Sequence, residues 1–184
     1  MTLSKIVLAV LTVFIAPSFA FSEENPRYSE ESQTLTIPSV DAADSPGLYQ
    51  ELEFELMQGN DWRMIRAKEG RQIREITNVE LVQTQTFPVQ IFLKISGRFS
   101  NGCPKLGKMS HALAGSDFNV AVYYRPQPEF DGTVVCIQAE VDFSTYMPLP
   151  VYGLDAGDYS YTVNDEVLTK NNSGTFTLTQ KNAF

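Results

Sequence analysis

Alternation of apolar and polar side chains is the feature that most constrains what this chain can fold into. In residues 51–56, Leu52, Phe54 and Leu56 alternate with three glutamates. Since successive side chains of a β-strand point to opposite faces, this pattern predicts a strand with one buried and one hydrated face. The turn residues at 59–60 predict a hairpin partner at 62–66. No amphipathic helix of ordinary length is visible, so the pattern predicts an all-β chain.

Further strand patterns follow in the second part of the chain, and turn residues such as Gly97 and Asn101 separate them. Short strands between turns favour a sandwich of two sheets. We therefore expect a small β-meander over 34–75 and a β-sandwich over 76–184. The further strands are expected at 79–82, 89–95, 118–124 and 134–137.

The first twenty residues have the composition of an export signal. Lys5 precedes an apolar run at 6–15, and small residues lead up to Ala20, after which we expect cleavage. The run is short for a bilayer span and an acidic stretch follows it, so we expect no stable membrane insertion. Residues 21–33 are rich in Glu and Ser and are expected to form a flexible leader. The mature protein is then secreted or periplasmic.

Charge and cysteine content narrow the class of protein further. The formal net charge is −8 at pH 7, and loss of a signal whose single charge is Lys5 makes it one unit more negative. This balance argues against nucleic acid as the main partner. Cys103 and Cys136 are the only cysteines. Two thiols in an oxidising compartment tend to pair, so we expect one disulfide between them.

The C-terminal part carries a motif of known modules. Residues 154–164 follow the pattern L-x-x-G-x-Y-x-x-x-V-N, and Phe176 to Leu178 form a closing F-x-L strand. This resembles the end of immunoglobulin-like and fibronectin-III-like sandwich modules of exported bacterial proteins. The resemblance implies an immunoglobulin-like β-sandwich over about 76–180, with Tyr159 as a corner tyrosine whose hydroxyl bonds to backbone near Leu154. It implies no particular function, because such sandwiches host many unrelated roles.

Few residues are suited to catalysis. His111 is the only histidine, and no G-x-S-x-G motif is present, so we expect no enzyme activity and no cofactor. Met109 and His111 would share a strand face if 108–113 is a strand. Because thioethers and imidazoles bind copper, a periplasmic copper-binding protein is an alternative function.

Two segments are candidates for recognition. A basic island at 63–74 stands out in an acidic chain, and it either contacts an anionic partner or pairs with the Glu51 to Glu55 face. A Tyr- and Pro-rich loop at 123–130 offers large, stiff contact residues. The leading hypothesis is therefore an exported non-catalytic binding or accessory module that recognises a protein or cell-envelope component through loops, and a secreted enzyme inhibitor is another alternative. The island comprises Arg63, Arg66, Lys68, Arg71 and Arg74, and the loop contacts are Tyr123, Tyr124, Arg125 and Phe130.

Overall fold

The computed structural model describes residues 25–41, 45–126, 135–164 and 171–184. Within these ranges all regular secondary structure is β-strand, in eleven strands and three sheets, which confirms the all-β prediction. No helix in these ranges has the length and apolarity to cross a membrane. The expected signal peptide at 1–20 and Phe130 of the expected loop lie outside the described residues.

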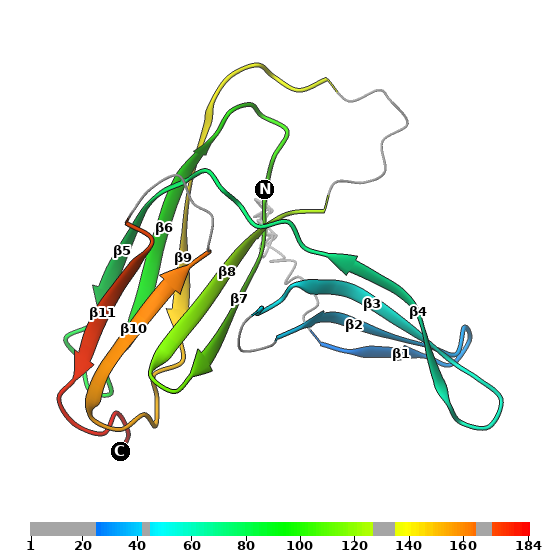
Figure 1. Ribbon diagram of the computed structural model, residues 1–184, viewed down its shortest axis with the longest axis horizontal. Coiled ribbons are helices and arrows are strands. Elements are labelled where there is room, and N and C mark those ends of the chain that lie inside the picture. Colours follow the sequence, from blue (N-terminus) through cyan, green and yellow to red (C-terminus); the bar gives the residue numbers. More distant parts are fainter. Residues whose placement is uncertain (1–24, 42–44, 127–134, 165–170) are drawn as a thin grey trace, which may run out of the picture.

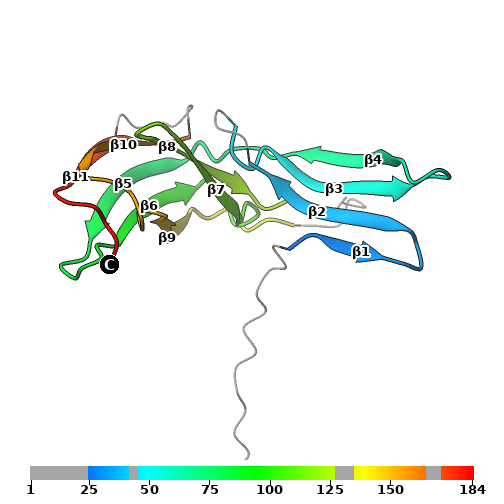
Figure 2. The same ribbon diagram turned by 90° about the horizontal axis from the view of Figure 1, so that it is seen from below.

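The predicted β-meander is a single four-stranded antiparallel sheet that extends to one side of the other two sheets (Figure 2). Its strands, in spatial order, are β1 (Arg27–Ser29), β2 (Thr34–Val40), β3 (Tyr49–Leu56) and β4 (Trp62–Glu69). The strand β1 lies inside 21–33, where the sequence predicted a flexible leader. It is short and mainly polar, and its pairing with β2 holds it, with Tyr28 opposite Leu35.

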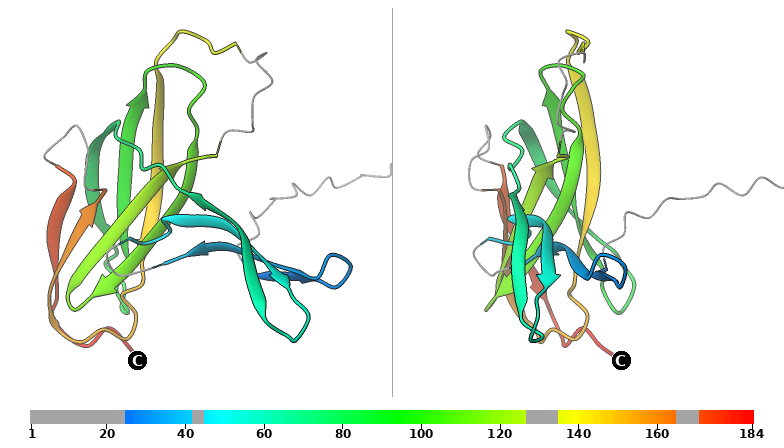
Figure 3. Two further views of the ribbon diagram at one scale, coloured as in Figure 1. Left: turned by 45° about the vertical axis from the view of Figure 1, so that its right-hand side comes forward. Right: turned by 90° about the vertical axis from the view of Figure 1, so that its right-hand side faces the viewer.

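The other two sheets form the predicted β-sandwich. Figures 1 and 3 show them as two layers. The core between them contains side chains from both layers, among them Leu93 and Ile95 from one sheet and Phe118 and Val122 from the other, all with 0% exposure. One sheet has the order β5 (Ile76–Gln83), β6 (Ile91–Phe99), β9 (Val141–Leu149), and the other has the order β11 (Ser173–Leu178), β10 (Gly157–Val163), β8 (Asp117–Tyr124), β7 (Leu106–Ala114).

Two features of the sandwich differ from the sequence prediction. The described residues of the expected strand at 134–137 form no strand, and β9 begins only at Val141. The sequence analysis did not predict β9, which has alternating burial and contains Pro148 near its end. Proline is tolerated because β9 is the last strand of its sheet and needs no outward ladder bond. In the other sheet, β8 and β10 run parallel, whereas antibody domains have antiparallel sheets.

The predicted disulfide is present and ties two connecting segments of the sandwich together. Cys103 follows β6 and Cys136 precedes β9, and their Cα atoms are 5.2 Å apart. A backbone hydrogen bond of 3.0 Å from Gly102 N to Ile137 O lies beside the bridge. The two segments are therefore held by covalent and polar contacts.

Tyr159 occupies the position of a corner tyrosine, as the sequence resemblance implied. Its hydroxyl donates to the Asp155 carbonyl over 3.0 Å, next to the expected Leu154. Its ring stacks on Phe176 at 5.5 Å between centroids and packs against the core. The hydroxyl is thereby satisfied within the fold.

The chain between meander and sandwich is fixed along β8. Ile73 N donates to Val122 O over 2.9 Å, and Tyr124 N donates to Arg71 O over 2.9 Å. The amide of buried Asn164 donates to Ile73 O over 2.7 Å and its carbonyl accepts from Val122 N over 2.7 Å. These bonds place residues 71–73 alongside the end of β8, beyond the last residue of β10, and fix where the meander ends.

Candidate functional site

Tyr123 lies at the junction of meander and sandwich, and its side chain is buried. It is 0% exposed, and its hydroxyl donates to Pro46 O over 2.6 Å. Burial raises the pKa of this hydroxyl above its usual value. A Cβ atom at Gly70 would lie 2.6 Å from the Tyr123 ring, so glycine is needed for this close packing. The ring was expected to contact a partner, but here it joins the two parts of the molecule.

Tyr124 and Arg125 continue the expected binding loop. The Tyr124 hydroxyl donates to Glu75, and the Arg71 guanidinium lies 4.3 Å from the ring centroid. Burial, followed by the bond to the Glu75 carboxylate, raises the pKa of Tyr124 to about 12. Arg125 bonds through its backbone to Lys105 O over 2.9 Å. Its neighbours from 127 onward are outside the described residues, so the loop hypothesis stays a prediction there.

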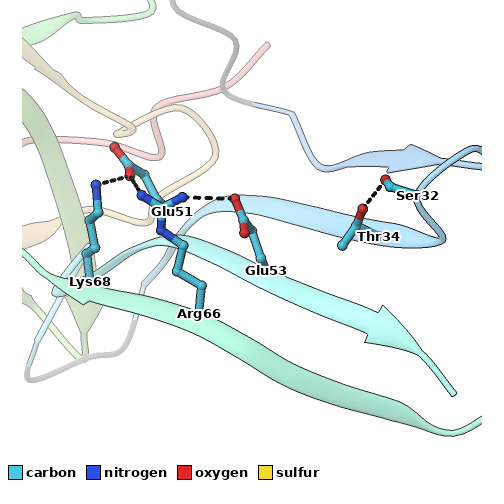
Figure 4. Close-up of polar contacts among 6 residues, drawn as sticks. All are labelled: Ser32, Thr34, Glu51, Glu53, Arg66 and Lys68. Carbon is cyan, nitrogen blue, oxygen red and sulfur yellow. Dashed lines mark hydrogen bonds and ion pairs between the residues drawn. The ribbon is translucent and has the colours of Figure 1, made fainter. Parts of the chain in front are cut away.

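Much of the basic island is paired with the glutamates of the neighbouring strand (Figure 4). Arg66 lies 3.3 Å from Glu53 and 3.5 Å from Glu51, and Lys68 lies 2.6 Å from Glu51. Arg63 pairs with Glu55 at 2.6 Å. For Arg63, Arg66 and Lys68 the structure therefore shows cross-strand pairing with glutamates, which is the second of the two interpretations of the island. Such exposed pairs contribute little stability, but they keep this face of the sheet hydrated.

The opposite face of the meander is apolar and largely exposed. Register places Tyr28 opposite Leu35, Phe54 opposite Met64 and Leu56 opposite Trp62, so these side chains share one face. Tyr28, Met64 and Trp62 are 48%, 57% and 46% exposed. The rings of Tyr28 and Trp62 meet edge to face, 5.9 Å apart. We call these three exposed side chains, Tyr28, Trp62 and Met64, the meander patch.

Sequence reasoning singled out none of the meander patch. Trp62 and Met64 were placed on a hairpin strand, but nothing in the pattern shows whether a second layer covers that face. Tyr28 lies in the stretch expected to be flexible. The sequence nevertheless contained one signal. The apolar face of the predicted hairpin had no other predicted element to cover it, so its side chains could be expected to stay exposed.

A groove of about 880 Å³ lies between the meander and the β7 side of the sandwich. β7 and β9 are the last strands of the two facing sheets, and both contribute to its wall. Met109 and His111, the two candidate ligands of the alternative copper-binding function, line this groove, and so does Met147 from β9. Lys108 and Arg125 are also in the wall, and the Lys108 amine donates to Ser39.

Ser110 and His111 do not form a catalytic pair. Adjacent residues of a strand point to opposite faces. Ser110 is 4% exposed, faces Gly47, and its hydroxyl has no hydrogen-bond partner. Among the described residues, no three His, Cys, Asp or Glu side chains are grouped so as to hold a metal ion.

Comparison with known proteins yields one match. Residues 93–178 are similar to the family described as the ORF11 beta-sandwich domain. The matched region begins at the third residue of β6 and ends with β11, so it covers most of the sandwich and none of the meander. The match agrees with the two-layer fold. No curated protein and no solved structure matches the chain.

Proposed function

We propose that this protein is an exported, non-catalytic binding module that engages a protein partner through the meander patch. One observation carries the proposal: Tyr28, Trp62 and Met64 share a face of the meander that no second sheet of the described residues covers, and each is about half exposed. Contiguous exposed apolar side chains on a soluble protein mark interaction sites. The sandwich then serves as the scaffold that presents this sheet.

The chemistry of the patch suits a protein surface. Trp and Tyr are enriched among the residues that dominate binding free energy, and Met is enriched in interfaces. The edge-to-face contact of Tyr28 with Trp62 holds both rings in place before a partner arrives, so less side-chain entropy is lost on binding. The paired charges on the other face keep it in water. The sheet therefore offers one face for contact.

The loop at 123–130 is a weaker candidate for the contact surface. Tyr123 is buried at the junction, and the Tyr124 hydroxyl is bound to Glu75. An inhibitor that inserts this loop into an enzyme would have to rely on Arg125 and on residues such as Phe130, outside the described ranges. The meander patch needs no rearrangement to be reached.

Affinity capture tests the proposal. The form comprising residues 21–184 is immobilised and exposed to envelope extract and culture medium of its own host, then washed with salt. We expect a specific protein partner to remain, since apolar contacts persist in salt whereas exposed charge contacts weaken. A double variant, Trp62→Ala with Met64→Ala, should lose the partner.

Tyr152→Ala supplies the matched control, because Tyr152 is 66% exposed and lies on the sandwich side. This variant should capture as the unaltered protein does. Retention of the same partner by the double variant would remove the meander patch as the contact surface. Loss of the partner on Tyr152→Ala would move the contact to the sandwich. Export is checked by measuring the mass of the protein that the host releases. This mass should match a chain that begins at Phe21.

A further inference from the structure

Three side chains with soft donor atoms line the groove, and they come from two sheets. Met109 and His111 are two residues apart on β7 and lie opposite Val122 and Val120, both of which face the core. Met147 lies on β9 opposite the core residue Leu93. Since side chains two apart share a strand face, all three project from the inner faces of the sandwich at its open edge. All three line the groove.

The surroundings leave these ligands available. No hydrogen bond or ion pair joins the His111 imidazole to another described side chain, and His111 is only partly buried. Met109 is partly buried against the core, and Met147 is 6% exposed. The cysteines are held in a disulfide and do not compete as thiolates. The thioether sulfurs of Met109 and Met147 and the imidazole of His111 are therefore the soft ligands that this part of the molecule offers.

We propose that Met109, His111 and Met147 form a binding site for monovalent copper. Thioether sulfur selects Cu(I) among the common biological metals, and imidazole is also suited to copper. Hard cations such as Ca²⁺ and Mg²⁺ need several oxygen ligands. The groove wall contains the carboxylates of Asp41 and Glu51, and Glu51 is already paired with Lys68 and Arg66. The donor set thus favours a soft cation.

Silver(I) is the probe, because it is a soft monovalent ion that needs no reductant, so the disulfide stays intact during the titration. The purified protein is titrated with silver nitrate in chloride-free buffer. Calorimetry gives the affinity, and native mass spectrometry gives the number of ions bound. We expect one tightly bound ion per chain.

Met109→Leu and Met147→Leu remove the thioethers at nearly constant volume, so the fold should tolerate them. Loss of groups that merely orient a metal ligand costs about 10 to 100-fold in affinity, so loss of a ligand itself should cost about tenfold or more. His111→Gln should weaken binding to a similar degree. Met57→Leu is the control, since Met57 lies on the meander and is 38% exposed. It should leave the affinity unchanged.

Methyl carbon NMR of the methionines, with each signal assigned from a single Met→Leu variant, gives a second readout. On addition of one equivalent of silver(I), the signals of Met109 and Met147 should shift and those of Met57 and Met64 should not. The proposal would be overturned if the protein binds no silver, or if both leucine variants leave the affinity unchanged. It would also be overturned if only the signals of Met57 and Met64 shift.

Discussion

The strands of the sandwich and of the meander share the same alternation of apolar and polar residues, but their apolar side chains are buried to different extents. In β6 the inward residues reach 0% exposure at Leu93 and Ile95, because a second sheet covers them. In β3 the alternation is as regular, yet Phe54 and Leu56 stay partly exposed, and nearly all of β4 is exposed. The pattern reports which side chains share a face, and only a second layer decides whether that face is buried.

The largest expected loss of stability comes from a comparison of one phenylalanine in the sandwich with one in the meander. Phe118→Ala removes a fully buried ring from the sandwich core and should lower the free energy of unfolding by about 3 to 5 kcal/mol. Phe54→Ala removes a half-buried ring from the meander and should cost only about 1 kcal/mol. Urea unfolding followed by circular dichroism measures both. Equal losses would show that a second layer covers the meander in solution.

A buried asparagine connects the two regions and gives the next largest effect. Asn164→Ala leaves Ile73 O and Val122 N without their side-chain partners, and it places alanine at a φ of 46°. The loss should be about 2 to 3 kcal/mol. Asn60 is the matched control, since it has a φ of 64° in the exposed β3–β4 turn. If Asn60→Ala costs as much, backbone strain and not the hydrogen bonds explains the effect.

The same contrast explains what the sequence could predict. Most strand faces, the disulfide and the backbone bond of Tyr159 follow from alternation, cysteine count and a local motif, and the structure contains them, whereas the strand expected at 134–137 is wrong. The burial of Tyr123 depends on Pro46 and Gly70, which are distant in sequence and join it only in the folded chain. The grouping of Met147 with Met109 depends on which strands end the two sheets. Local patterns contain neither kind of information.

Alkaline pH should weaken the junction through Tyr124. Its pKa is raised to about 12 in the folded protein and is 10.0 for an ordinary tyrosine. The stabilisation is therefore complete below pH 10 and is lost as the pH rises toward 12. Tyr124→Phe should flatten this part of the stability profile, measured by thermal unfolding between pH 8 and 12. Burial also raises the pKa of Tyr161, in the sandwich, so Tyr161→Phe gives the comparison.

Ser110 gives the smallest expected effect. Its buried hydroxyl has no partner, so Ser110→Ala should leave stability unchanged or raise it by about 1 kcal/mol. Ser144→Ala, which removes an exposed hydroxyl that lies 3.1 Å from Ser96 Oγ, is the reference for an ordinary serine. A clear loss of stability for Ser110→Ala alone would mean that the Ser110 hydroxyl has a hydrogen-bond partner in solution.

Trp62 reports directly on whether the apolar face of the meander is open, because it is the only tryptophan in the chain. At 46% exposure, its emission should lie toward the red, and acrylamide should quench it efficiently at any protein concentration. A blue emission that resists acrylamide would contradict the account, because the meander patch would then be covered already in the isolated protein.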